Sequence, residues 1–297
     1  MKSFKISLML LSMFAAFAGS AMAAPSNEIQ KDIQVEVNNS EVKTDTHPYI
    51  KNGSAIVPLN VVQQIPGVSI TWDNASKTIT ITRDHDTVKL VAGQKTATVG
   101  GKQVALSAPS SIEKGRVMVP LRFIAESSNA GVVWNAKTRT VSIAKANEAL
   151  IHKYKSKKLS ESRTAALAYP RLSLLKEPDV KNESQSQEYL FVSGKSDQFF
   201  ILGGNGIYYY KIVGNYAQKL WTARSGHEGK SGLFFYPFNL IEQDGVKPII
   251  NSKITFYYYM GTIGAASYGF ITPDGKRTEL GQKDMDFNQF FEIPEEK

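Results

Sequence analysis

One long segment occurs twice in this sequence, at a spacing of 62 residues and without a gap. The first copy, residues 54–83, is SAIVPLNVVQQIPGVSITWDNASKTITITR, and the second, residues 116–145, is RVMVPLRFIAESSNAGVVWNAKTRTVSIAK. A chain that repeats itself at a fixed period folds as copies of one supersecondary unit. We therefore predict one repeat unit over residues 31–94 and a second over residues 95–146.

Each unit also contains a tight turn upstream of the repeated segment. At the same spacing, VNN at residues 37–39 aligns with VGG at residues 99–101. Asn-Asn and Gly-Gly both accept the positive φ angles of a hairpin turn. Each unit is thus predicted to contain a hairpin, a variable stretch, a strand ending in Val-Pro-Leu, a short helix and a second hairpin.

Two prolines predict where the short helices begin. Pro58 and Pro120 suit the first helical position, where the missing N–H has no partner to lose. One apolar face then follows at helical spacing, formed by Leu59 and Val62 in the first copy and by Leu121, Ile124, Ala125 and Ser128 in the second. Gly67 and Gly131 mark the return to extended chain.

The second hairpin of each unit shows the alternation of strands with one buried face. The residues predicted to point inward are Ile70, Trp72, Ile79 and Ile81 in the first copy and Val132, Trp134, Val141 and Ile143 in the second. The turns between these strands are predicted at residues 73–74 and 135–136.

The residues that the two units share are determinants of shape rather than chemistry. They are the pairs Gly53/Gly115, Pro58/Pro120, Leu59/Leu121, Trp72/Trp134, Thr78/Thr140 and Ile81/Ile143. Each is predicted to serve as a turn, a helix start or a core residue. We therefore assign no catalytic, cofactor-binding or metal-binding residue to the repeat.

The second copy closely resembles a known family. Its sequences VMVPLRFIAE (residues 117–126) and VVWNAKTRTVSI (residues 132–143) are similar to the copper amine oxidase N-terminal-like domain, or stalk domain, of many secreted bacterial proteins. The family pattern falls on Val119, Pro120, Leu121, Arg122, Phe123, Trp134, Asn135, Thr140, Val141 and Ile143. Unit one departs from it, because Asn60 and Val61 replace the Arg-Phe pair. The resemblance covers residues 31–146 at most and implies the appendage of the oxidase, not its catalytic part.

The residues of amine oxidase chemistry are not found in the expected pattern. That family holds copper with three histidines, two of them in His-x-His, and a copper site needs clustered imidazoles. The histidines of this chain are His47, His85, His152 and His227, none within a His-x-His. The quinone precursor of the family lies in Asn-Tyr-Asp/Glu, whereas Asn215-Tyr216 is followed here by Ala217. We predict neither amine oxidase activity nor a cofactor.

The first 23 residues have the order of a secretory signal peptide. Lys2 and Lys5 form a positive segment, residues 6–18 are apolar, and Ala21-Met22-Ala23 (residues 21–23) is a small-x-small cleavage site. A membrane anchor would need about 20 apolar residues. We predict that a bacterial signal peptidase cleaves the chain after Ala23. The mature protein is predicted to be secreted or envelope-associated, without a transmembrane anchor.

The cysteine content indicates how the fold is stabilised, and the charge indicates which class of partner it favours. The chain has no cysteine, so an exported protein of this size must be held together by hydrophobic cores instead of disulfides. Loss of Lys2 and Lys5 with the signal lowers the formal net charge from +8 to +6. This balance favours anionic surroundings such as wall polymers or lipid head groups. No nucleic-acid-binding motif occurs, so we predict no nucleic-acid partner.

Residues 147–187 are predicted to link two domains. Residues 147–159 form a candidate basic helix, for which an exposed helix is favoured over a membrane-surface role. Pro170, Pro178 and the polar run KNESQSQE at residues 181–188 follow. The polar run is the predicted domain boundary.

The last segment, residues 188–297, is dominated by aromatic residues. It holds 22 of the 31 aromatic residues of the chain, in short clusters separated by Gly, Asn and Asp. The clusters predict six or more strands in a sandwich or barrel-like sheet. Runs at residues 208–210 and 256–259 place aromatic rings on both faces of a strand. One face is predicted to be core, and the other to lie under a second layer or to be exposed for binding sugar rings.

Two short motifs in this segment have stronger structural explanations than functional ones. DMDFNQFFEIPE at residues 284–295 places oxygens at several positions of a calcium-binding loop, but it lacks the central glycine, so an acidic strand and tail is favoured. SGHE at residues 225–228 brings a hydroxyl, an imidazole and a carboxylate together in sequence. A catalytic triad depends on spatial placement, and a flexible polar loop is favoured here.

The predicted fold class is α+β, with two β-hairpin/short helix/β-hairpin stalk-type repeats followed by a separate, mostly-β domain. The predicted function is that of an exported, non-catalytic envelope protein whose β domain binds wall glycan or a surface protein. A wall-directed hydrolase with its site in residues 188–297 is one alternative. A protein–protein assembly module with pairing edge strands is another. No particular oligomeric state is predicted.

Overall fold

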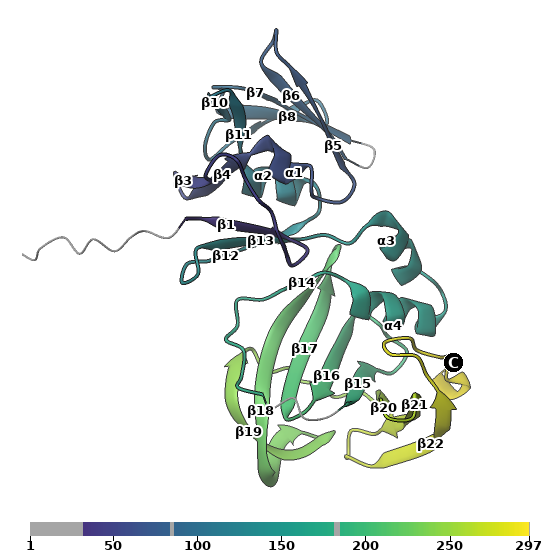
Figure 1. Cartoon of the computed structure of the whole chain (residues 1–297). Coiled ribbons are helices and arrows are strands. Elements are labelled where there is room, and N and C mark those ends of the chain that lie inside the picture. The colour runs from purple at the N-terminus through teal and green to yellow at the C-terminus, as the bar shows by residue number, and fades with distance from the viewer. Residues whose placement is uncertain (1–31, 84–85, 181–184, 297) are drawn as a thin grey trace, which may run out of the picture. The chain divides into compact units, whose positions relative to one another are not determined.

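The computed structural model describes residues 32–83, 86–180 and 185–296 (Figure 1). The predicted signal peptide, residues 1–23, lies outside the described residues. The described strands form four sheets and far outweigh the short helices. The β-rich character predicted from the sequence is therefore confirmed.

Residues 32–146, here called the N-terminal half, contain two series of elements in the same order. The first series is β1 (Gln34–Val37), β2 (Ser40–Glu41), β3 (Tyr49–Lys51), β4 (Ser54–Pro58), α1 (Leu59–Val62), β5 (Val68–Asp73), β6 (Thr78–Arg83) and β7 (Asp86–Val91). The second is β8 (Thr96–Val99), β9 (Lys102–Ala105), β10 (Ser111–Glu113), β11 (Arg116–Pro120), α2 (Leu121–Ser127), β12 (Gly131–Asn135) and β13 (Thr140–Ala144). Strands β8 to β11 each begin 62 residues after their counterparts β1 to β4.

The two Val-Pro-Leu strands pair with each other. Strand β4 runs antiparallel to β11 at the centre of a sheet of order β10-β11-β4-β3. Val57 lies opposite Val119, its own counterpart at a spacing of 62, with Pro58 opposite Met118. Because equivalent residues face each other in antiparallel strands, the pairing has local two-fold symmetry about the Val57–Val119 pair.

The remaining strands of the two series share their sheets. In the sheet β12-β13-β1-β2, the first-series strand β1 lies parallel to the second-series strand β13, with Gln34 opposite Thr140. In the sheet β5-β6-β7-β8-β9, strand β7 separates β6 from β8. The two series therefore do not form two separate bodies, and β7 was not predicted as a distinct strand from the repeat.

Left-handed backbone conformations recur at the repeat spacing. The residue pairs with positive φ on both members are Asn38/Gly100, Asn39/Gly101, Asn52/Lys114, Gly53/Gly115, Gly67/Asn129 and Lys77/Arg139. The first two pairs lie in the turns of the β1–β2 and β8–β9 hairpins, which confirms those predicted turns. Gly67 directly precedes β5 and Gly131 begins β12, which confirms that both mark the return to extended chain. The left-handed counterpart of Gly67 at the repeat spacing is Asn129, at φ 55°.

Gly115→Ala is expected to lower the free energy of unfolding by about 1 kcal/mol, because a Cβ disfavours the left-handed region. Gly115 has φ 78°, and an added Cβ would meet no atom within 4 Å, so the backbone conformation alone accounts for the loss. Urea unfolding measures this change. Gly203→Ala is the control, since an added Cβ there makes only an ordinary 3.5 Å contact with Gln187. An equal loss in both variants would contradict the explanation.

The helices lie where the sequence predicts, with a shift of one residue. Pro58 and Pro120 are the last strand residues and occupy the N-cap position, rather than the first helical position. This follows from their ψ angles of 145° and 103°, which remain extended. The predicted face of α2 is confirmed, because Leu121, Ile124, Ala125 and Ser128 are all buried.

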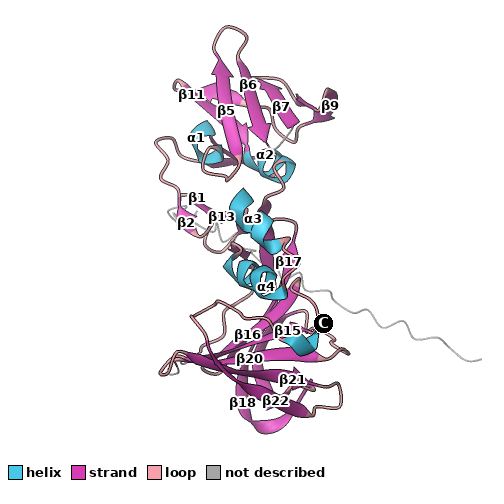
Figure 2. Ribbon diagram, turned by 90° about the vertical axis from the view of Figure 1, so that its right-hand side faces the viewer, coloured by secondary structure: helices cyan, strands magenta, loops and turns pink. Residues whose placement is uncertain are grey.

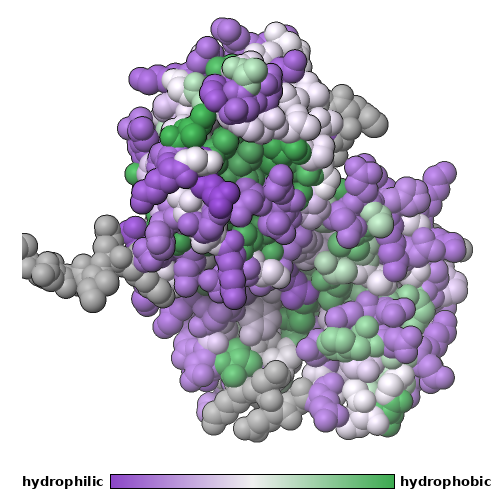
Figure 3. All heavy atoms as spheres, turned by 45° about the horizontal axis from the view of Figure 1, so that its top comes forward, coloured by the Kyte–Doolittle hydropathy of each residue, from purple (hydrophilic) through white to green (hydrophobic). Residues whose placement is uncertain are grey.

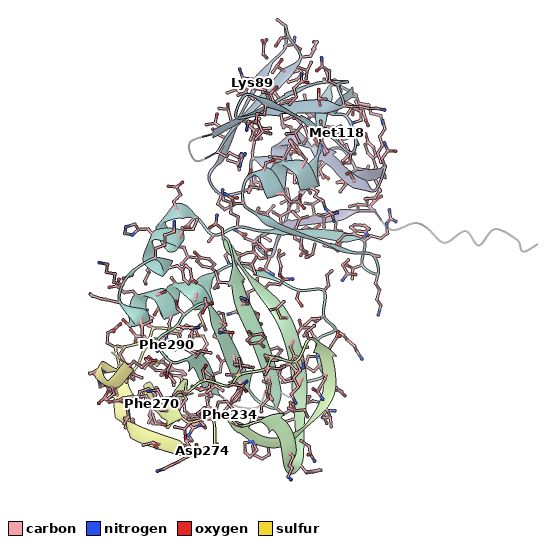
Figure 4. The ribbon with its side chains drawn as sticks, turned by 180° about the vertical axis from the view of Figure 1, so that it is seen from behind. Lys89, Met118, Phe234, Phe270, Asp274 and Phe290 are labelled. Carbon is pink, nitrogen blue, oxygen red and sulfur yellow. The ribbon has the colours of Figure 1, made fainter. Side chains whose placement is uncertain are left out.

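The shared residues of the two series occupy turn, cap and core positions. Pro58, Pro120, Ile81, Leu121, Thr140 and Ile143 are buried, Leu59, Trp72, Thr78 and Trp134 are half-buried, and Gly53 and Gly115 lie in exposed turns. Apart from the two prolines, the apolar members pack into one core with Val57, Val119 and Ile124. Figure 4 labels Met118, which is fully buried in a smaller cluster with Ile56.

The described part of residues 147–296, here called the C-terminal half, contains two α-helices, one short 3₁₀ helix and one large sheet (Figure 2). The elements are α3 (Glu148–Tyr154), α4 (Leu159–Ala168), β14 (Arg171–Leu172), β15 (Ser186–Val192), β16 (Gln198–Gly203), β17 (Gly206–Val213), β18 (Tyr216–Leu233), β19 (Tyr236–Gly245), β20 (Ile254–Met260), β21 (Ala265–Ile271), β22 (Arg277–Asp284) and the short helix η1 (Pro294–Glu296). The strand order is β14-β18-β17-β16-β15-β20-β21-β22, and β19 pairs with β18.

The predicted linker contains ordered elements. The side chain of Asn147 caps α3 by accepting a hydrogen bond from the Leu150 N–H at 2.9 Å. Leu150 and Tyr154 of α3 pack with Tyr169 and with Ala217 of the sheet. The part of residues 147–187 that precedes β14 therefore packs on the C-terminal sheet, while the domain boundaries themselves stay a prediction.

Candidate ligand groove of the C-terminal half

Most aromatic rings of the C-terminal half are core residues on one or other face of the large sheet. One face buries Tyr189, Phe191, Phe199, Tyr210 and Tyr257 under α4 and residues 285–293. On the other face, residues of β18 and β19 pack into a second apolar layer. Its buried rings are Phe200, Tyr209, Trp221, Phe235 and Phe256. The predicted aromatic runs thus serve mainly to fill two apolar layers, one on each face.

At one end of the second layer, the side chains that continue it are left partly uncovered. Tyr258 lies opposite Glu188, and Glu188 lies opposite Leu202, on three neighbouring strands. Directly opposed residues point to the same face of a sheet, so these three side chains continue the layer of Phe256. They line a shallow groove of about 240 Å³.

Two rings of β19 form the other wall of the groove. Tyr236 and Phe238 meet edge to face, with centroids 5.4 Å apart. Phe238 is 37% exposed and Tyr258 38% exposed, so both present ring surface to solvent. The turn from Gly203 to Gly206 completes the lining.

One carboxylate lies among these rings. Glu188 Oε1 accepts a hydrogen bond from Arg277 Nη1 at 2.7 Å, and the Arg277 guanidinium lies 3.6 Å from the centroid of the Phe256 ring. Burial raises the pKa of the Glu188 carboxyl, against the charge and hydrogen bond of Arg277, which lower it. Burial also raises the pKa of the Tyr236 phenol, against a hydrogen bond with Ser225 that lowers it. The groove therefore offers ring faces, the neutral phenol of Tyr236 and one carboxyl acceptor.

The other short motifs do not come together as sites. Ser225 and His227 lie within strand β18, where Ser225 pairs with Leu240, so the predicted flexible loop is corrected to a strand. In residues 284–295, Met285, Phe290 and Ile293 are buried in the core. Among the described residues no three His, Cys, Asp or Glu side chains gather as a metal-binding group. His85 lies outside the described residues.

Residues 36–143 match the family of the copper amine oxidase N-terminal domain. This confirms the resemblance that the Val-Pro-Leu-Arg-Phe segment carries. The primary amine oxidase of Klebsiella aerogenes is 32% identical to this chain over 87 residues, which are 29% of this chain and 12% of that protein. The chain thus spans only a small share of the length of this curated relative. Because the family match concerns the N-terminal domain, it assigns no oxidase activity here.

The described helices are short. None of them is long and apolar enough to cross a membrane.

Proposed function

We propose that this chain is an exported, non-catalytic envelope protein whose C-terminal sheet binds a glycan in the groove of Tyr236, Phe238 and Tyr258. The observation that carries the proposal is the convergence of two exposed rings, one half-buried ring and one carboxyl group at the uncovered end of an otherwise buried layer. Binding sites combine apolar surface with a few placed polar groups in this way.

The chemistry of the groove suits a sugar ring. The C–H face of a pyranose is apolar and packs on an aromatic ring, while its hydroxyl groups need hydrogen-bond partners. Phe238 and Tyr258 supply ring surface, and the Glu188 carboxyl and the Tyr236 hydroxyl supply acceptors. The net positive charge of the chain would favour approach to an anionic wall.

We also propose that the N-terminal half is built from two copies of one stalk-type unit that exchange strands. The spacing of 62 residues between equivalent strands, the paired left-handed residues and the Val57–Val119 pairing support this proposal. Its role would be to hold the C-terminal sheet within the envelope. Export rests on the sequence of residues 1–23.

Retention of the mature chain on purified peptidoglycan tests the groove. Tyr258→Ala is expected to weaken retention about tenfold, or ~1.4 kcal/mol, because it removes one stacking face. Phe287→Ala is the matched control, since Phe287 is a 52% exposed ring that does not line the groove.

Three outcomes would count against the proposal. An equal loss of retention in both variants would show that the groove does not contact the peptidoglycan. Retention that disappears only through salt screening would point to net charge instead of ring stacking. Release of soluble wall fragments by the chain would replace glycan binding with hydrolysis.

A further inference from the structure

A second hollow lies in the N-terminal half, among elements of both series. Its walls come from the β3–β4 hairpin, from α2 and from the β12–β13 hairpin, and its volume is about 290 Å³. Three elements that belong to different sheets or to a helix meet here, and their side chains leave space between them. Figure 3 shows apolar surface gathered on the N-terminal half within a polar surround.

The walls of this pocket are apolar. Ile50, Ala55, Leu121, Trp134 and Val141 line it, and Ile50 is 45% exposed although it is a large aliphatic residue. Trp134 lies directly opposite Val141 in the β12–β13 hairpin, so the two side chains form one continuous wall. An apolar lining of this size, about 300 Å³, is at the small end of ligand pockets.

One charged side chain lies at the pocket, and it is a cation. Arg122 is 56% exposed, and its nearest paired carboxylate is Glu126, with Nε and Oε1 3.9 Å apart. Exposed ion pairs of this kind are weak. The guanidinium is therefore free to take a second anion, to which it can donate two parallel hydrogen bonds. No acidic residue lines the pocket.

The counterpart position in the first series lacks this cation. Asn60 stands at the position equivalent to Arg122, while Trp72 is equivalent to Trp134. The combination of Trp134 with a neighbouring guanidinium therefore occurs in the second series and has no equivalent in the first. Trp72 consequently provides an internal reference for any effect of a ligand at Trp134.

We propose that this pocket binds a small amphiphilic anion, with its apolar body against Trp134 and Leu121 and its carboxylate or sulfonate on Arg122. The ligand class is an aryl or short alkyl acid, because the walls are apolar and the lining offers no partner for several hydroxyl groups. This site is independent of the proposed glycan groove.

The test is a titration of the mature chain, labelled with ¹⁵N, with 3-phenylpropanoate and separately with its neutral amide. Saturable shifts are expected at the indole N–H of Trp134, assigned by Trp134→Phe, and none at Trp72. The acid is expected to bind about tenfold more tightly than the amide. Absence of a saturable shift at Trp134, or equal affinity for acid and amide, overturns the proposal.

Two variants identify the cation. Arg122→Gln is expected to raise the dissociation constant of the acid about tenfold and to leave that of the amide unchanged. Lys102→Gln removes the same charge from an exposed position of β9 and is expected to change neither. An Arg122→Gln protein that retains the acid at unchanged affinity, or a Lys102→Gln protein that loses it equally, overturns the assignment.

Discussion

Glu296→Gln is expected to lower the free energy of unfolding by about 3–5 kcal/mol, because it leaves a buried cation without its partner. Glu296 belongs to the short helix η1, and Arg163 belongs to α4, with side chains that are 1% and 0% exposed. The two are joined by a bidentate pair, in which Nη1 and Nη2 each donate to a carboxylate oxygen at 2.6 Å.

The surroundings of this ion pair satisfy its remaining polar atoms. Arg163 also donates from Nε to the Lys195 carbonyl at 3.1 Å and from Nη1 to the Tyr257 hydroxyl at 3.0 Å. Its guanidinium lies 4.8 Å from the centroid of the Phe191 ring. On the other side, Glu296 Oε1 accepts from the Gly194 N–H at 3.0 Å. Because both side chains are buried, loss of the carboxylate charge leaves the Arg163 guanidinium desolvated and without an anionic partner.

Chemical unfolding of the full chain measures the effect, with Glu295→Gln as the control. Glu295 is the exposed neighbour in η1, so its substitution should leave the free energy of unfolding unchanged within error. Replacing both partners, as in Arg163→Met with Glu296→Met, should recover most of the loss, since no charge then stays buried. Equal stability of the Glu295 and Glu296 variants would disprove the account.

The same carboxyl group predicts a pH dependence. Burial raises the pKa of Glu296, but the hydrogen bonds and charge of Arg163, with contacts from Thr255 and Gly194, hold it below its ordinary value. A lowered pKa in the folded state means that this stabilisation is present above the unfolded pKa, about 4.3, and is lost as pH falls toward the folded value. As the pH is lowered from 5 to the lowest pH at which the protein still folds, the free energy of unfolding should therefore fall more for wild type than for Glu296→Gln.

Phe290→Ala is expected to lower the free energy of unfolding by about 3–5 kcal/mol, because it opens a cavity among aromatic rings. The Phe290 ring lies 4.7 Å from Tyr257, 5.2 Å from Phe191 and 5.3 Å from Tyr189, measured between centroids. Its N–H donates to Thr164 Oγ1 of α4 at 3.0 Å, and Figure 4 shows it between α4 and the C-terminal strands. Residues 285–293 thus cover the sheet together with α4.

Thermal and urea unfolding of Phe287→Ala provides the comparison for Phe290. The two residues have the same side chain in the same segment, but Phe287 is 52% exposed and Phe290 only 8%. The Phe287 variant should unfold within about 0.5 kcal/mol of wild type. If both variants lost the same stability, burial of Phe290 would not be the cause.

Local features of the fold could be predicted from the sequence because neighbouring residues determine them. The turns at residues 38–39 and 100–101, the helix after Pro120 and its buried face all follow from backbone preferences and short-range periodicity. The repeat likewise placed equivalent elements 62 residues apart. None of these inferences requires knowledge of which strands meet.

From the sequence alone follow the repeated elements of residues 32–146, without β7, and the β-rich character of the C-terminal half. The pairing of β1 with β13 and the contact of Arg163 with Glu296, 133 residues away, become known from the three-dimensional arrangement. The same holds for the exposure of Tyr258 beside the buried Tyr257. The physical reason is that long-range pairing and burial depend on what packs against each face, whereas adjacent aromatic residues have the same local preference for a strand.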